Sequence, residues 1–444
     1  ILEPYVKRCR QHDDVRIVIP KSAKVTDIVF ECPTCGARIA KGLSYLQCRK
    51  CGEGQVRWNV HKARSVYSPC GMVLINPPRP EHRERLKIAG GGRKALNWVL
   101  EGLQSHGPGD VAAKQTREEL ITSLRGFPPE MIQSIVENAE RSGVLARPGD
   151  DPADQLDADT RKWGEHDAVD IAMALAESRK PASELCSPNP GDSLDVRYRE
   201  RYPQALTRAG VAGLDFVDKF PVLTAMYGFT RGDGDPSTSR LLPFRRPKRD
   251  GFRLYGELAE TEAYLIRLDP IRVANWLLRR GHQVQGWFLG DEDPVAARVA
   301  ILRSTEPPNK YDDQEASTAG ADLLRLVHTY AHRFIRQTAV LAGIDRDALS
   351  EYLVPRHLAF FMYASARGSF VLGGLQAVFE STLDELLDAV VDAEHRCALD
   401  PGCSRGSGAC HACVHLGEPS CRFFNRFLDR GTLFGADGYL RAQR

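Results

Sequence analysis

The sequence predicts a multidomain α/β protein, with a strand-rich N-terminal region, a helical middle region and a mixed α/β domain at the C-terminal end. Three observations support this class. The chain has 444 residues, enough for roughly two to four domains. Short apolar runs near the start have strand character, whereas apolar residues in the last third recur at helical spacing. Nine of the 12 cysteines lie in two short segments far apart in the chain, four at 32–51 and five at 397–421.

The overall composition is that of an ordinary globular protein. Hydrophobic residues make up 42% and charged residues 27% of the chain, and the formal net charge is +2. A charge so near zero provides no global argument for nucleic-acid binding, so any such site must be local. No run approaches the roughly 20 apolar residues that a membrane-spanning helix needs, and we expect no membrane insertion.

Changes in composition along the chain divide it into five regions. Residues 147–214 are rich in Pro, Gly and Asp and contain few large apolar residues, which predicts a linker around one amphipathic helix. The helical region before it is either winged-helix-like or a small connector, and the connector is the simpler interpretation. The predicted regions are 1–80 (strands, with a cysteine-rich ribbon at 32–52), 81–146 (helical), 147–214 (linker-rich), 215–315 (α/β with a basic loop) and 316–444 (C-terminal domain).

The first cysteine group has the spacing of a zinc ribbon. Two Cys-x-x-Cys knuckles stand a hairpin's length apart, and a glycine follows each knuckle, where it permits a tight turn. Four thiolates so placed suit tetrahedral Zn²⁺ and leave no open coordination position, which predicts a structural or docking role. Iron–sulfur binding and vestigial thiols are the alternatives. The expected ligands are Cys32, Cys35, Cys48 and Cys51.

The second cysteine group lies in CSRGSGACHACVHLGEPSC, residues 403–421. Cys397, at the end of the preceding helix, is either a core residue or a replacement for Cys403, and His411 is expected to point outward. The chain is too large and helical for a disulfide scaffold, and no βαβ context supports thioredoxin-like chemistry. Paired cysteines therefore predict metal binding in a reducing compartment, the cytoplasm. We expect a second structural Zn²⁺ held by Cys403, Cys410, Cys413 and Cys421.

Apolar patterns place several elements in the second half of the chain. FPVLTAMYGFT and LAFFMYAS predict strands, and TEAYLIRLDPIRVANWLLRRG predicts a strand followed by a helix. TLDELLDAVVDAEHRC predicts a helix with a capping box between Thr382 and Glu385. His328 and His332 lie one helical turn apart without the Glu of a His-Glu-x-x-His motif, so packed or capping histidines are the favoured interpretation.

The loop FRRPKRDGFR, residues 244–253, is the candidate nucleic-acid contact. Basic side chains neutralise phosphates and aromatic rings stack on bases, the two components of single-strand binding. A solvated basic loop is the alternative. The chain contains no Gly-x-x-x-x-Gly-Lys-Ser/Thr loop, so we expect no ATP site of that kind. The expected contacts are Arg245, Arg246, Lys248, Arg249 and Arg253, beside Phe244 and Phe252.

The C-terminal half resembles a known family. HRCALDPGCSRGSGACHAC, followed by SCRFFNRFLDRGTL, is similar to the MrfA-like zinc-binding domain, which is appended to mitomycin-repair DNA helicases. FMYASARGSFVLGGLQ is similar to the family's strand and Gly-rich turn, and LLRLVHTYAHRF to its opening helix. Together with GFTRGDGDP and LAETEAYLIRLDPIRVANWL, the resemblance covers about residues 215–436. Within the family it is nearest to stand-alone helicase-partner subunits of the DISARM phage-defence system.

The resemblance implies a zinc-binding, non-catalytic subunit of an anti-phage DNA-processing complex, with two structural Zn²⁺ ions. A separate helicase subunit would supply the ATPase, and this chain would supply a rigid interface and contacts to DNA with single-stranded character. Two rival hypotheses stay open. One is a metal-dependent nuclease or other hydrolase that uses dispersed residues such as His328, His332 and Asp384. The other is a zinc-ribbon transcription regulator.

Overall fold

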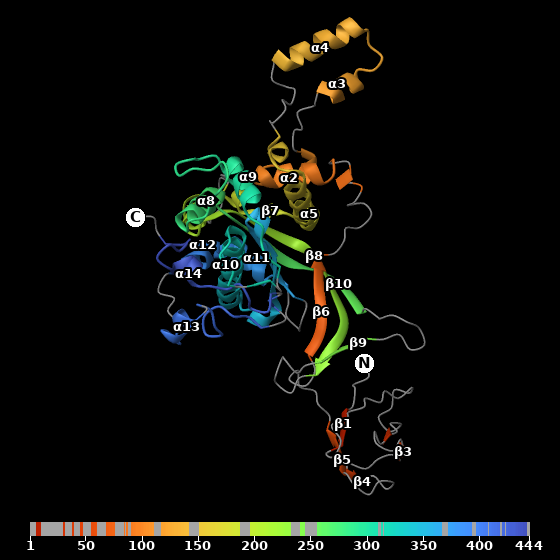
Figure 1. Cartoon of the computed structure of the whole chain (residues 1–444), viewed down its shortest axis with the longest axis vertical. Helices are drawn as coiled ribbons and strands as arrows, with labels where there is room; N and C mark the ends of the chain where they lie inside the picture. The colour runs from red at the N-terminus through yellow and green to blue at the C-terminus, as the bar shows by residue number, and fades with distance from the viewer. Residues whose placement is uncertain are drawn as a thin grey trace. The chain divides into compact units, whose positions relative to one another are not determined.

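The computed structural model of the chain (Figure 1) divides into two compact units, Ile1–Val73 with Thr224–Glu257 and Leu74–Leu223 with Leu258–Arg444. The four predicted zinc ligands at 32–51 and the five predicted DNA contacts at 245–253 lie outside the part of the chain that the structure describes. The described residues are 6–9, 30–31, 38–39, 45–47, 55–59, 68–75, 84, 86–87, 90–110, 117–141, 151–186, 196–231, 240–244, 255–309, 312–313, 315–365, 372–392, 397–406, 408–417, 420–421 and 423–441.

Short antiparallel strands make up much of the described part of the first unit. A three-stranded sheet has the order β1-β5-β4, and a separate pair joins β2 to β3. The strand bounds are Val6–Cys9 (β1), Phe30–Glu31 (β2), Arg38–Ile39 (β3), Tyr45–Gln47 (β4) and Gln55–Asn59 (β5).

The larger sheet has the strand order β11-β12-β10-β8-β6, with β7 and β9 each paired to β8. The pairs β10·β12, β11·β12, β7·β8 and β8·β9 are antiparallel. Together with the helices, this confirms the mixed α/β class. The bounds are Ser68–Ile75 (β6), Lys180–Pro181 (β7), Val211–Arg231 (β8), Arg240–Pro243 (β9), Tyr255–Leu268 (β10), Leu349–Val354 (β11) and Ala359–Ala364 (β12).

The long helix α10, Ala319–Ala342, lies at the centre of the second unit and contacts β11, β12, α11, α12 and α14 (Figure 1). It begins at Thr318, whose hydroxyl accepts a hydrogen bond from a backbone N–H of the first turn, and ends at Gly343 in the left-handed conformation. Phe334 packs edge-on against Tyr264 of β10 and Phe360 of β12, with ring centroids 6.2 and 6.0 Å apart. This helix carries His328, His332 and Arg336, which the site described below uses.

None of the described helices is long and apolar enough to span a membrane. Helices α5, α6 and α7 fall within 147–214, where the sequence predicted mainly linker. The bounds are Gly92–Leu100 (α2), Arg117–Ser123 (α3), Pro129–Arg141 (α4), Ala158–Leu175 (α5), Ala182–Leu185 (α6), Tyr202–Arg208 (α7), Pro270–Arg279 (α8), Pro294–Ser304 (α9), Gly374–Ser381 (α11), Leu383–Val391 (α12), Gly402–Arg405 (α13) and Gly431–Phe434 (α14).

Most local predictions in the second half are confirmed, and one is wrong. The predicted strands at β8 and β12 and the strand–helix pair β10–α8 are present. Helix α12 is present too, but Thr382 makes no side-chain capping bond at its start. Glu385 instead accepts a hydrogen bond from Arg197, which also binds Asp384 at 2.7 Å. A tertiary ion pair therefore replaces the local capping box.

Candidate metal centre

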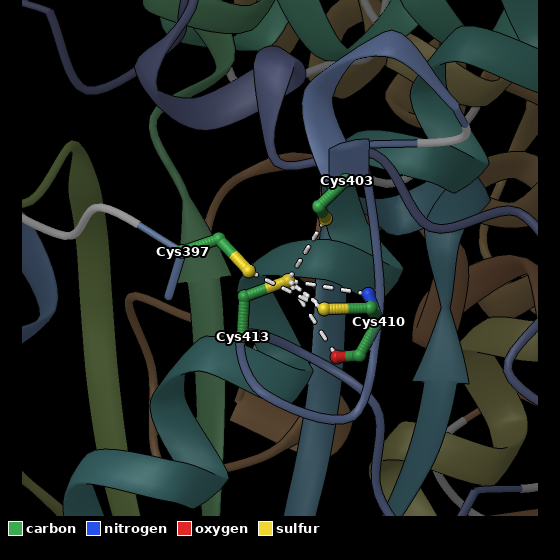
Figure 2. Close-up of side chains that lie close together, drawn as sticks. All are labelled: Cys397, Cys403, Cys410 and Cys413. Atoms are coloured by element: carbon green, nitrogen blue, oxygen red, sulfur yellow. Dashed lines mark hydrogen bonds between the residues drawn. The ribbon is translucent and has the colours of Figure 1, made fainter. Parts of the chain in front are cut away.

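Four cysteine side chains converge in the C-terminal part of the second unit (Figure 2). Cys403 lies on the short helix α13, which follows a turn that begins at Cys397. Cys410 and Cys413 belong to the next turn, a knuckle closed by hydrogen bonds of 3.0–3.1 Å from three successive N–H groups to the Cys410 carbonyl. These two turns direct all four sulfur atoms toward one another.

The sulfur atoms lie at the spacing of a tetrahedral metal site. The Sγ–Sγ distance is 3.3 Å for Cys397 and Cys410, 3.5 Å for Cys410 and Cys413, and 3.7 Å for Cys403 and Cys413. Four thiolates placed about 2.3 Å from a tetrahedral Zn²⁺ would be about 3.8 Å apart. A disulfide would need about 2.05 Å, so these are free thiols. The group can therefore hold a metal ion.

The electrostatics of the group favour a cation at its centre. Burial raises the pKa of the Cys403 and Cys413 thiols. Burial also opposes ionisation of Cys410, but hydrogen bonds from Cys397, Cys413 and Cys403 outweigh it and lower the pKa of Cys410 to about 7. One thiolate can form near neutral pH, and its charge adds to burial in raising the pKa of Cys413. Because like charges at this spacing repel strongly, ionisation of all four thiols requires a cation among them.

Three side chains hold the cysteine-bearing turns in place. Arg336 of α10 donates hydrogen bonds of 3.2–3.5 Å to three backbone carbonyls of the knuckle and the residues after it. Arg430 donates to both carboxylate oxygens of Asp400, at 2.8 and 3.0 Å, within the turn between Cys397 and Cys403. Asn425 exchanges two hydrogen bonds of 2.9 Å with the backbone of Leu416. Such outer contacts orient ligands before the metal binds.

The structure groups the C-terminal cysteines differently from the sequence-based set. Cys397 joins three of the four expected ligands, and Cys421 lies apart from them, with His328, His332 and Glu351. The chain after the knuckle turns toward α10, where the Val414 carbonyl accepts a hydrogen bond from His332 at 2.8 Å. This turn carries Cys421 away from the other sulfurs. The structure therefore places Cys397, and not the expected Cys421, with the other three cysteines.

Part of the chain has a relative among known proteins. Part of the chain is similar to a protein named DISARM protein DrmB from Bacillus paralicheniformis, with 32% identity over 125 residues. The match covers 24% of this chain and 22% of that protein, so the chain matches about a fifth of its relative's length. No protein-family model matches the chain.

Several other residues singled out in the sequence have structural partners. Asp384 is buried and paired with Arg197, away from the two histidines with which a hydrolytic site was considered. His328 and His332 are fully buried, as packed histidines would be, but in a group of metal-ligand types. Their spacing was visible in the sequence. Glu351 carried no such signal, because a lone acidic residue in a strand is unremarkable until the fold shows what it faces.

Proposed function

We propose that Cys397, Cys403, Cys410 and Cys413 hold a structural Zn²⁺ ion. The support is the donor set: four sulfur atoms within 4.8 Å of one another, the soft ligands that tetrahedral zinc prefers. When bound, the ion would neutralise the thiolates and cross-link the turns that carry them. Four protein ligands leave no position for a substrate, so the site would be structural rather than catalytic.

We further propose that the chain is a non-catalytic subunit of a DISARM-like anti-phage complex, with a separate helicase subunit that supplies ATP hydrolysis. The partial similarity to the DISARM protein DrmB carries this proposal. The cysteine group agrees with it, since the resemblance of residues 215–436 to the MrfA-like zinc-binding domain rests on the same knuckle. In this proposal the zinc-stabilised domain provides the interface for the helicase subunit.

Purification of the tagged protein from its own cells tests both parts. Mass spectrometry should find a helicase subunit in the same sample in which elemental analysis finds zinc. Cys410→Ser should reduce zinc content and helicase recovery together, because the knuckle would lose its fold. Cys186→Ser is the matched control, since Cys186 is a free, half-buried thiol outside both ligand groups. Zinc without any helicase would reject the subunit role and leave the metal assignment intact.

We propose that the basic loop supplies a DNA contact of the complex. The support is compositional: five basic residues beside two phenylalanines within 244–253. Charge reversal at Arg245, Arg246 and Arg249 should weaken single-stranded DNA binding by the complex. It should also reduce the slope of log affinity against log salt, by about 0.7 for each phosphate that the loop no longer neutralises. An unchanged slope would place the DNA-binding surface elsewhere.

A further inference from the structure

A second group of metal-ligand side chains lies beside the cysteine group and shares none of its members. His328 and His332 project from one face of α10, one helical turn apart, toward Glu351 of β11 and toward Cys421. The two histidines and Glu351 are 0% exposed, and Cys421 is 2% exposed. Nothing in the proposed zinc-bound cysteine group explains why these four polar side chains are brought together in the core.

The ligand atoms of this group have the separations of a four-coordinate site. The Nε2 atom of His328 lies 3.1 Å from one carboxylate oxygen of Glu351 and 3.3 Å from the Cys421 sulfur. The Nε2 atom of His332 lies 3.4 Å from the other carboxylate oxygen. Tetrahedral zinc with nitrogen and oxygen ligands at about 2.0–2.2 Å and sulfur at about 2.3 Å would place these atoms about 3.3–3.8 Å apart.

Four polar atoms of the group are left without hydrogen-bond partners. Both carboxylate oxygens of Glu351 and the Nε2 atom of His332 lie close together, yet they are buried and make no hydrogen bond, and the same holds for the outer Nδ1 atom of His328. Each unsatisfied buried polar group costs about 1–3 kcal/mol, and more when it is charged. The close contacts are therefore poorly oriented for direct bonding, whereas an ion in the group would satisfy the two Glu351 oxygens and the His332 nitrogen.

The tautomer of His332 is already the one that a metal requires. Its Nδ1 atom lies 2.8 Å from the Val414 carbonyl oxygen, which can only accept, so Nδ1 carries the hydrogen. The lone pair of a neutral His332 is then on Nε2, directed into the group. A ring nitrogen that donates to a carbonyl while the other binds metal is the usual arrangement at protein metal sites.

A metal-free arrangement is the competing explanation. Burial disfavours a charged His328, but the carboxylate of Glu351 and the Cys421 sulfur outweigh burial and raise the pKa of His328 to about 10. The group would then be a buried ion pair of imidazolium and carboxylate. That explanation leaves both Glu351 oxygens without a well-oriented donor, and it gives no role to the convergence of His332 on them.

We propose that His328, His332, Glu351 and Cys421 form a further structural metal site, separate from the cysteine groups, which takes a divalent transition metal ion of the zinc type. One carboxylate and one thiolate balance the charge of the ion, and two neutral imidazoles complete the coordination. Binding displaces the thiol proton and any proton on the imidazoles to solvent. Because all four side chains are buried, no substrate can reach an open position, so the ion would join α10, β11 and the C-terminal segment rather than catalyse a reaction.

X-ray absorption at the zinc edge of the purified, unaltered chain tests the proposal without any substitution. Cysteine-only sites would give a single sulfur shell at about 2.3 Å. The site formed by the two histidines, Glu351 and Cys421 would add a nitrogen and oxygen shell at about 2.0–2.1 Å, with the outer-shell scattering of imidazole rings. A spectrum with sulfur ligands alone, at full metal loading, would overturn the proposal.

Metal content of variants assigns that shell to these residues. His332→Ala and Glu351→Gln should each lose one metal equivalent per chain, and the nitrogen and oxygen shell should disappear. His357→Ala is the matched control, because His357 is also buried and bonded to a carbonyl, that of Gly164 at 2.9 Å, but lies outside the group. It should keep every metal equivalent. A folded His332→Ala variant that retains the full metal content would overturn the proposal. If neither variant folds, the zinc-edge spectrum of the unaltered chain decides whether the nitrogen and oxygen shell is present.

Discussion

Asp215 is a side chain whose replacement should strongly destabilise the second unit. It lies on β8 and is 0% exposed. Its carboxylate accepts a hydrogen bond of 2.8 Å from Arg179 and two, of 2.9 and 3.2 Å, from Arg267. Both guanidinium groups also donate to backbone carbonyls of the loop after α2, so the carboxylate ties that loop to the sheet. Asp215→Asn keeps the shape but leaves two nearly buried cations without their counter-charge.

The burial of the two arginines sets the size of the expected loss of unfolding free energy. The side chains of Arg179 and Arg267 are only 9% and 12% exposed, so water cannot replace the missing carboxylate. Removal of one partner from a buried ion pair costs about 3–5 kcal/mol, and we expect the upper part of that range because two pairs are broken. The assay is urea unfolding followed by far-ultraviolet circular dichroism.

The matched control is Asp388→Asn, which makes the same chemical change in an exposed pair. The side chains of Asp388 and Arg208 are 50% and 56% exposed, with a closest N–O distance of 2.5 Å. An exposed pair contributes about 0–1 kcal/mol, so this variant should unfold almost as the unaltered protein does. Equal losses of unfolding free energy in Asp215→Asn and Asp388→Asn would refute the reasoning.

Three further predictions follow from other interactions. Burial raises the pKa of Asp322, but hydrogen bonds from two arginines and a histidine outweigh burial and lower this pKa. The ionised carboxylate therefore stabilises the fold above the unfolded pKa of about 3.9, and this stabilisation is lost as the pH falls through the folded pKa. The unaltered protein should lose more unfolding free energy between pH 5 and 3 than Asp322→Asn does. Arg336→Met should speed metal transfer from the cysteine group to a chromogenic chelator by about 10–100-fold, because it removes the three hydrogen bonds that tie the knuckle to α10. Gly210→Ala should lower the unfolding midpoint more than Gly281→Ala. Both glycines have positive φ, a backbone conformation that costs an L residue about 1–2 kcal/mol. Only at Gly210 would the added carbon also meet a neighbour, 2.7 Å from the Tyr439 ring.

The sequence alone determined the local elements with strong periodicity. Alternating and continuous apolar residues predicted β8, β10 and β12, and helical spacing predicted α8 and α12. These predictions succeed because the period of buried positions follows directly from backbone geometry. The capping box at Thr382 failed for the opposite reason, since Arg197, distant in sequence, competes for the Glu385 carboxylate.

The sequence also determined that the C-terminal cysteines form a metal-ligand type of group, because the knuckle spacing depends on a local turn. Only the tertiary structure decided the membership of each group. Cys397 and Cys421 both flank the knuckle, and nothing in their spacing says which sulfur meets the other three. The path of the chain across α10 decides it, and the same path sets Cys421 beside two histidines and Glu351. Convergence of residues from a helix, a strand and a loop depends on packing between distant segments, and a linear pattern carries no record of that packing.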